Sequence, residues 1–134
     1  MDKDRFIERL ADVNRSVVRL TEAVEQAESP LVRDAVIQRF EFTFEVVWKA
    51  LKLYLEHQGH ECGGPRQTLK KAFDEKVIEG LEQSDAWLEM LNDRNMTSHA
   101  YDEGTALSVY ANIVHKYARL LREMADKLNA LKWD

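Results

Sequence analysis

The segment from Leu91 to Tyr101 holds the residues of this chain that are best suited to chemistry. Arg94 carries a permanently charged fork that fits phosphate oxygens, and His99 carries the side chain best able to exchange a proton near neutral pH. Together they could support metal-free cleavage of RNA, in which a ribose 2′-hydroxyl attacks the adjacent phosphorus. One group would manage protons while the other stabilises the charge that gathers on the phosphate.

The spacing between Arg94 and His99 constrains this interpretation. Residues five apart on a continuous helix point about 140° away from each other, at roughly 100° per residue. We therefore expect either that the helix distorts or ends within residues 95–98, where the hydroxyls of Thr97 and Ser98 can bond to the local backbone, or that a second copy of the chain completes the site. The alternative is that Arg94 pairs with Asp93 or Asp102 and that His99 only caps a helix.

Other polar residues could support this site. Asn95 follows the arginine directly, and Glu41 and Glu45 are four apart on one face of a predicted helix. If that helix lines the cleft, either carboxylate could orient the imidazole or the guanidinium. An ordinary surface ion pair between Glu45 and Lys49, one turn further on, explains the pattern equally well.

Helical periodicity predicts the elements that must position these residues, because apolar side chains repeat at steps of three and four along most of the chain. One helix ends near Ser29 and Pro30, and its apolar stripe is Phe6, Leu10, Val13, Val17, Leu20 and Val24. A second helix begins there and stops in the stretch 57–64, and its stripe is Val36, Phe40, Phe44, Val47, Leu51 and Leu55.

Three further helices are predicted towards the C-terminus. A short one spans Pro65 to about Lys76, and a fourth takes its N-cap from Ser84 and Asp85 and runs into Arg94. The last spans about Asp102 to Lys132, and its apolar stripe is Leu107, Tyr110, Val114, Tyr117, Leu121, Met124, Leu128 and Leu131.

The predicted fold class is all-α, because no segment shows the period-two alternation of a half-buried strand. We expect an up-and-down helical bundle of about five helices, three long and two short. Residues 1–134 suit a single domain. Phe42 points away from the apolar stripe of its helix and, with Trp48, suggests an extra apolar face for a partner or a second copy. A core that wraps more of that helix is the alternative.

The balance of charge is acidic, with 24 Asp and Glu against 19 Lys and Arg and a formal net charge of -5. This argues against broad, unspecific attraction to nucleic acid, but it allows a local basic face. Such a patch could form around the short third helix, or the same residues could simply be a solvated helix face; they are Lys49, Lys52, Arg66, Lys70 and Lys71.

Cysteine use and hydropathy indicate a soluble, cytoplasmic protein. Cys62 stands alone, so no disulfide can form within the chain, and a reducing compartment is expected. His57, His60 and Cys62 lack a fourth ligand at a zinc-like spacing, so we expect no metal and no cofactor. No secretory signal is evident, and no apolar run reaches the roughly 18 residues that would suggest a membrane span.

The spacing Arg94-x4-His99-x-Tyr101 matches the R-x4-H-x-Y signature of HEPN-domain proteins. Its setting, RNMTSHAY, resembles the nucleotidyltransferase substrate-binding protein family within that group. The run from Ile37 to Lys49, IQRFEFTFEVVWK, is similar to the second helix of that family. The resemblance covers nearly the whole chain, and it implies a HEPN-like bundle.

The resemblance also implies a function. It implies a homodimer encoded beside a minimal nucleotidyltransferase, with HepT-like members acting as RNase toxins in toxin–antitoxin pairs of the MntA/HepT type. On this resemblance Arg94 contacts the phosphate of RNA, His99 serves in acid–base catalysis, and Tyr101 accepts adenylyl groups from the partner. Phosphates added there would block RNA by charge and bulk.

Two other functions fit the same residues. The chain could be a non-catalytic substrate-binding subunit of a two-component nucleotidyltransferase, or a helical scaffold whose polar motif is buried and internally bonded. We do not expect the chain itself to be the nucleotidyltransferase, because Gly63 and Gly64 follow a helix and lack the Walker pattern of a phosphate-binding loop.

Overall fold

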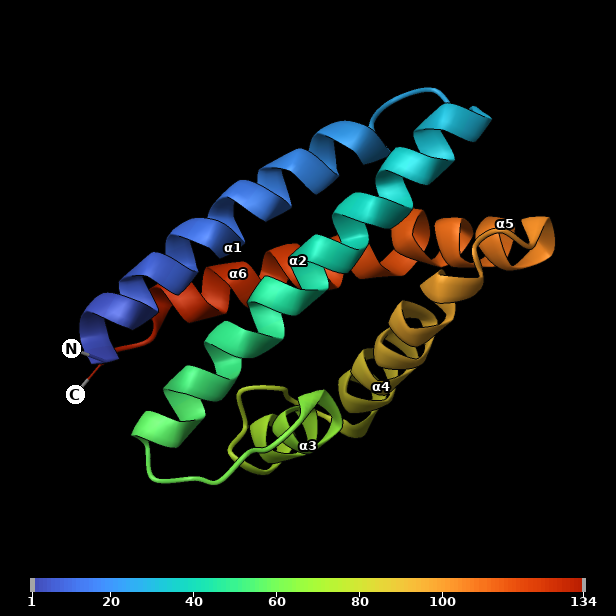
Figure 1. Cartoon of the computed structure of the whole chain (residues 1–134). Coiled ribbons are helices and arrows are strands. Elements are labelled where there is room, and N and C mark those ends of the chain that lie inside the picture. Colours follow the sequence, from blue (N-terminus) through green and yellow to red (C-terminus); the bar gives the residue numbers. More distant parts are fainter. Residues whose placement is uncertain (1, 134) are drawn as a thin grey trace.

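The computed structural model describes residues 2–133, and the regular elements within this range are all helical. Helices α1 (Asp2–Val24) and α2 (Pro30–His57) form a long antiparallel hairpin, and α6 (Ala118–Ala130) packs against both of them (Figure 1). The shorter α3 (Pro65–Asp74) and α4 (Leu81–Met96) pack on each other and on α2. The predicted all-α bundle is therefore confirmed.

The turn between α1 and α2 has the predicted chemistry. Ser29 is in an extended conformation, and its hydroxyl oxygen accepts a hydrogen bond from the backbone N–H of Val32 at 3.1 Å. Pro30 then occupies the first helical position, where a missing N–H costs nothing. This N-cap fixes where the chain reverses and where α2 begins.

Helix α2 is the central element of the core. All six residues of its predicted stripe are buried, and the ring of Phe40 stacks on that of Tyr117 with centroids 5.6 Å apart. Phe42 is 64% exposed, as its position outside the stripe predicts. Because α2 contacts α1, α3, α4, α5 and α6, side chains on its different faces meet residues from distant parts of the chain.

The start of α4 differs from the predicted position. The helix begins at Leu81, with Gly80 as N-cap, so the expected N-cap at Ser84 and Asp85 is wrong. Gly80 has φ 86° and ψ 149°, a conformation that is open to glycine and strained for other residues. Its carbonyl accepts the N–H of Ser84 at 3.1 Å, which closes the first turn upstream of the predicted cap.

The C-terminal helical segment is continuous but not uniform. Asp102 caps α5 (Glu103–Asn112), and a π-helical turn, Ile113–Tyr117, joins α5 to α6. This wide turn shifts the buried face, so Leu107 of the predicted stripe is 40% exposed, while Ala106 is buried instead. A uniform step of three and four could not predict that shift.

The two ends of the described chain lie together (Figure 1). Phe6 near the start of α1 stacks on Trp133 beyond the end of α6, with ring centroids 4.9 Å apart. None of the helices within residues 2–133 combines the length and the apolar character that crossing a membrane requires.

Candidate functional site

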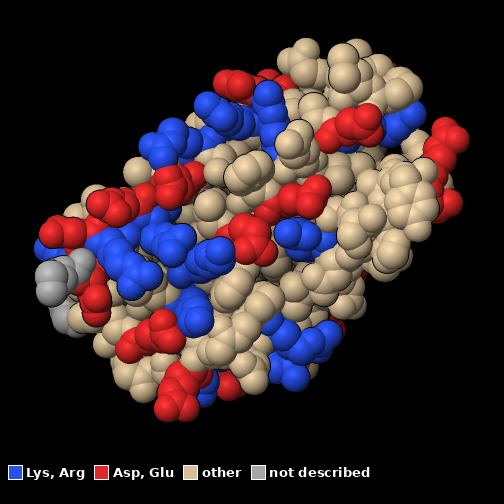
Figure 2. Space-filling view, viewed as in Figure 1, with Lys and Arg blue, Asp and Glu red and all other residues tan. Residues whose placement is uncertain are grey.

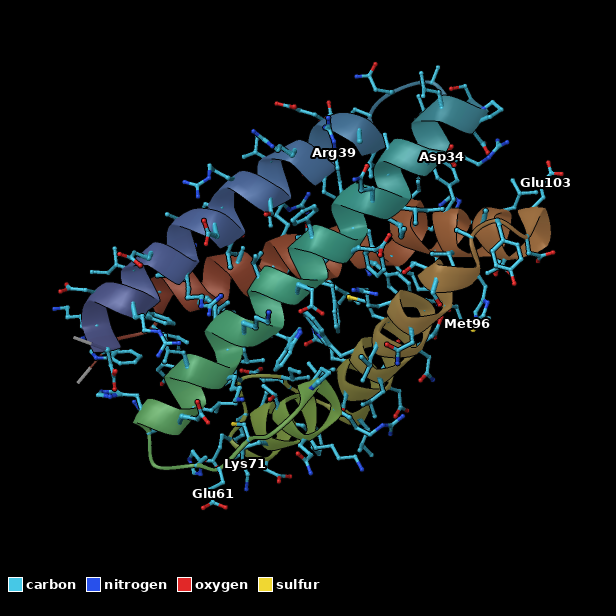
Figure 3. The ribbon with its side chains drawn as sticks, viewed as in Figure 1. Asp34, Arg39, Glu61, Lys71, Met96 and Glu103 are labelled. Atoms are coloured by element: carbon cyan, nitrogen blue, oxygen red, sulfur yellow. The ribbon has the colours of Figure 1, made fainter. Side chains whose placement is uncertain are left out.

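The connection from α4 to α5 carries the residues singled out for chemistry. Helix α4 ends at Met96 and is followed by a 3₁₀ turn, Thr97–His99. The Thr97 hydroxyl donates to the carbonyl of Arg94 at 2.7 Å, so the side chain competes for the backbone where the helix ends. The break expected from the spacing is confirmed, and Figure 3 labels Met96 and Glu103 on its two sides.

Arg94 points from the last turn of α4 towards α2. Its Nη1 lies 3.7 Å from a carboxylate oxygen of Glu41, and its Nη2 lies 3.8 Å from one of Glu45. Nη1 is also 3.4 Å from the Thr97 hydroxyl. These separations exceed the roughly 2.7–3.2 Å of a strong N–H···O bond, and Nε is buried with no hydrogen-bond partner among the described residues. The Arg94 side chain is 26% exposed, and its two Nη atoms are held by the carboxylates only through these long contacts.

The alternative partners of Arg94 are engaged elsewhere. Asp102 caps α5, and its Oδ2 accepts from the hydroxyl of Thr105 at 2.8 Å and from its N–H at 3.0 Å. The hydrogen bond from the Thr105 hydroxyl and, to a smaller extent, the one from its N–H lower the pKa of the Asp102 carboxyl. Within residues 2–133, Arg94 therefore forms its ion pairs with Glu41 and Glu45 and with neither of the alternative partners, Asp93 and Asp102, and the side chain that caps α5 is that of Asp102.

His99 and Tyr101 lie side by side in solvent. The Nδ1 atom of His99 is 3.4 Å from the hydroxyl oxygen of Tyr101, and the two rings meet edge to face with centroids 5.9 Å apart. His99 is exposed, and Tyr101 is 86% exposed. Among the described residues no hydrogen bond joins either side chain to Arg94, and the exposed Asn95 side chain makes none at all. The side chains of the candidate site thus form two separate groups. His99 contacts Tyr101, and Arg94 contacts Glu41 and Glu45.

A polar cluster that the sequence did not reveal anchors α4 just before Arg94. The hydroxyl of Tyr117, in the π-helical turn, lies 2.5 Å from Asp93 Oδ2 and 3.2 Å from Glu89 Oε1. Burial, together with the hydrogen bond to Asp93, raises the pKa of Tyr117 well above its usual value, so the hydroxyl keeps its proton and donates. The spacing of four between Glu89 and Asp93 was the one signal in the sequence for a shared partner.

Each of these two carboxylates has a second partner. Asn112 Nδ2 donates to Asp93 at 2.9 Å, and Lys116 Nζ donates to Glu89 at 2.9 Å. The hydrogen bond from Lys116 is the main reason why the pKa of Glu89 lies below its usual value. The cluster ties α4 to the C-terminal helical segment, one residue before the guanidinium of the site.

His57, at the end of α2, and His60 and Cys62, in the loop that follows, do not form one cluster. His60 Nε2 is 2.9 Å from Glu75 Oε1, His57 stacks on Trp133, and Cys62 is buried. Burial raises the pKa of the Cys62 thiol, which disfavours the thiolate that binds metals. Within residues 2–133 no three His, Cys, Asp or Glu side chains are grouped so that they could hold a metal ion.

Comparison with known proteins relates this chain to a family and to individual proteins. Residues 8–130 match the family described as nucleotidyltransferase substrate binding protein like. A Haemophilus influenzae protein named "Probable ribonuclease HepT" is 33% identical over 82 residues, which are 58% of this chain and 54% of that protein, so the match spans about half the relative's length. A crystal structure of a protein from Thermus thermophilus is 36% identical, with a TM-score of 0.78 over 87% of this chain and 98% of the other.

Proposed function

Because this chain belongs to the nucleotidyltransferase substrate binding protein like family, we propose that it is the HepT-like component of a toxin–antitoxin pair and cleaves RNA without a metal ion. The observation that carries the proposal is the turn after α4, which presents His99 and Tyr101 side by side to solvent, close in sequence to the half-buried Arg94. The name of the Haemophilus influenzae relative supports the same activity.

The proposed reaction needs a proton acceptor, a proton donor and a cation. The imidazole of His99 takes the proton of the 2′-hydroxyl as the 2′ oxygen bonds to phosphorus. The bond to the 5′ oxygen breaks, and that oxygen takes a proton from water and leaves as a hydroxyl, so the products are a 2′,3′-cyclic phosphate and a 5′-hydroxyl. The guanidinium of Arg94 stabilises the charge on the non-bridging oxygens, a role worth about 10²–10³ in rate at comparable sites. Glu41 and Glu45 hold the guanidinium against α2.

We propose that the active form is a homodimer whose two protomers share one cleft, with Arg94 of one protomer beside His99 of the other, because within one protomer the two side chains belong to separate groups. Co-expression of His99→Ala with Arg94→Ala tests this arrangement. If Arg94 of one protomer acts with His99 of the other, the mixed dimer contains one intact site and regains activity that both separate variants lack. A mixed dimer as inactive as its parents would contradict a shared site.

Tyr101 is the proposed site of inactivation by a minimal nucleotidyltransferase. Its phenol oxygen, exposed and beside His99, loses its proton to solvent and attacks the α-phosphorus of ATP; the new oxygen–phosphorus bond forms as the bond from the α-phosphorus to the bridging oxygen breaks, and pyrophosphate leaves. The new phosphate then occupies the space next to the imidazole and repels the RNA backbone. Incubation with the partner enzyme and ATP should add mass to the parent protein and none to Tyr101→Phe, while Tyr54→Phe should still be modified.

The RNase proposal is tested with purified protein that is free of its partner. A labelled single-stranded RNA should be cut in the presence of a chelator, and His99→Ala should lower the rate by about 10²–10⁴, the usual contribution of a general acid or base. His115→Ala is the matched control, because this histidine is also exposed but lies in the π-helical turn. RNA that stays intact with the unmodified parent would refute the activity.

A second function, the non-catalytic substrate-binding subunit, is favoured by one observation. Glu41 and Glu45 surround the guanidinium of Arg94 and leave its immediate surroundings net negative, which weakens its attraction for a phosphate. This function predicts intact RNA together with stable co-purification with a nucleotidyltransferase. The scaffold interpretation needs all three groups closed off in internal bonds, which does not fit the exposed His99 and Tyr101.

A further inference from the structure

The seam between α1 and α2 contains a hollow that is separate from the turn after α4. It has a volume of about 200 Å³ and is lined from α1 by Arg5 and Arg9 and from α2 by Trp48, Lys49 and Lys52, with Leu53 and Glu56 completing it. Figure 2 shows Lys and Arg side chains gathered along this seam. Four basic side chains and a single carboxylate, that of Glu56, therefore line this small space.

These charges are largely unpaired. Within residues 2–133 no carboxylate lies within ion-pair distance of Arg5, Arg9 or Lys52, whereas Lys49 Nζ is 3.4 Å from Glu45. Like charges four apart on a helix, such as Arg5 and Arg9, weaken that helix slightly. The chain as a whole carries a net charge of -5, so a basic composition does not account for the cluster. A bound polyanion would relieve the repulsion.

The seam also offers an aromatic surface. Trp48 is partly buried at the edge of the hollow, and Lys52 Nζ lies 6.0 Å from the centroid of its ring. Basic side chains that follow a backbone, combined with an aromatic ring on which a base can stack, are the combination that proteins use to bind single-stranded nucleic acid. A site for a small isolated anion would need only the basic side chains and no aromatic ring.

A series of ion pairs along α2 links the hollow to the proposed cleavage site. Arg94 contacts Glu45, Glu45 contacts Lys49 one turn further along α2, and Lys49 lines the hollow. At about 5.4 Å per helical turn, the hollow begins one to two turns from the guanidinium. A strand whose scissile phosphate lies at Arg94 can therefore continue along α2.

The seam carries further arginines in the other direction. A second hollow of about 540 Å³ is lined by Arg15, Arg19 and Arg39 together with the exposed Phe42. More of these arginines have partners. Arg15 pairs with Asp12, and Arg39, labelled in Figure 3, donates to the carbonyl of Arg19 at 2.7 Å. The unpaired charge is concentrated in the first hollow.

From these observations we infer that the α1–α2 seam around Arg9, Trp48 and Lys52 is a binding groove for the phosphate backbone of single-stranded RNA next to the cleaved bond. The inference rests on the proposed RNase function, whose substrate it positions. It also revises the basic patch expected from sequence, because Lys49 and Lys52 line this hollow with α1 residues and without Arg66 or Lys70.

The test compares two matched pairs of substitutions in the His99→Ala background, so that the probe is not cut. Arg9→Gln/Lys52→Gln removes two charges from the groove, and Arg66→Gln/Lys70→Gln removes two exposed charges from α3. The probe is a fluorescein-labelled oligouridine of about 12 nucleotides, within the roughly 4–16 nucleotides that small single-strand sites cover. Binding is followed by anisotropy at several salt concentrations.

The groove pair should weaken binding at least tenfold at low salt, and the α3 pair should change it less than twofold. The slope of log K against log salt should fall by about 0.7 for each phosphate that the protein no longer neutralises on a single strand, hence by about 1.4 for the groove pair. RNA should also quench Trp fluorescence in the His99→Ala protein and leave it unchanged when Trp48→Phe is added.

Three results would overturn the groove. If both pairs bind RNA equally while protein with His99 intact still cuts it, the groove is wrong and the RNase function stands. If the His99→Ala protein binds no RNA and protein with His99 intact cuts none, both proposals are wrong. If the groove pair changes the oligomeric state measured by light scattering, the seam is an interface between copies of the chain.

Discussion

The hydroxyl of Tyr117 should contribute measurably to the stability of the fold through a hydrogen bond to Asp93. Replacing Tyr117 by phenylalanine removes one oxygen and keeps the ring that stacks on Phe40. The ring is fully buried, so the substitution tests the hydroxyl without opening a large cavity. Asp93 keeps Asn112 as a partner, and Glu89 keeps Lys116.

The size of the effect follows from these contacts. A hydrogen bond to a charged group contributes about 1.5–3 kcal/mol, and the lower part of that range applies because both carboxylates keep a partner and neither is fully buried. We expect Tyr117→Phe to lower the free energy of unfolding by about 1.5–2 kcal/mol. For a chain of this length that corresponds to a fall in Tm of about 5–10 °C.

The assay is urea unfolding followed by circular dichroism, with Tyr110→Phe as the matched control. Tyr110 lies in the same helical segment and is 8% exposed, and among residues 2–133 its hydroxyl has no hydrogen-bond partner. The control should change stability by no more than about 0.5 kcal/mol. Equal losses for the two variants would refute the view that the bond to Asp93 anchors α4.

Three further local features are tested by substitution, each measured by the free energy of unfolding. Because the pKa of Glu89 is lowered, its bond to Lys116 stabilises the fold at pH values above the ordinary Glu pKa, and this stabilisation is lost as the pH falls through the lowered value. Glu89→Gln should therefore cost at most about 1 kcal/mol at pH 7 and nothing at pH 2. A cost that does not change with pH would contradict this. Ser29→Ala removes the N-cap of α2 and should cost about 1 kcal/mol; no loss would mean that the cap is dispensable. Gly80→Ala places a side chain at φ 86° and should cost about 1–3 kcal/mol. Gly104→Ala, in the first turn of α5, places a Cβ at an ordinary contact distance of 3.5 Å from Asp102 Oδ2 and should gain about 0.4–1 kcal/mol; equal effects would refute the conformational explanation.

Local patterns in the sequence were sufficient for the helices and for the break in the site. The stripe of α2 and the cap at Ser29 depend on neighbours within a turn or two of the chain, so periodicity and side-chain chemistry predict them. The same holds for the end of α4, where the hydroxyl of Thr97 bonds to the carbonyl of Arg94. The start of α4 was missed because a glycine conformation, which no pattern of polarity reveals, set it at Gly80.

The candidate site was only partly predictable. The types and spacing of Arg94, His99 and Tyr101 stand in the sequence, and Glu41 and Glu45 were named as residues that could orient the site. That both carboxylates meet the guanidinium depends on how α4 packs on α2. The alternative, an ion pair between Glu45 and Lys49, is present as well at 3.4 Å, so Glu45 contacts both basic side chains.

The sequence by itself determined the helical class of this chain, most helix boundaries and the residues available for chemistry, because these depend on contacts between residues close in the chain. The tertiary structure alone decided the partners of Arg94, the pairing of Tyr117 with Asp93 and the meeting of Arg9 with Lys52 across the α1–α2 seam. Each of these joins elements far apart in sequence, and its geometry follows from which helical faces the core brings together. The π-helical turn is the clearest case, since one wide turn redirects the buried face of the last helical segment.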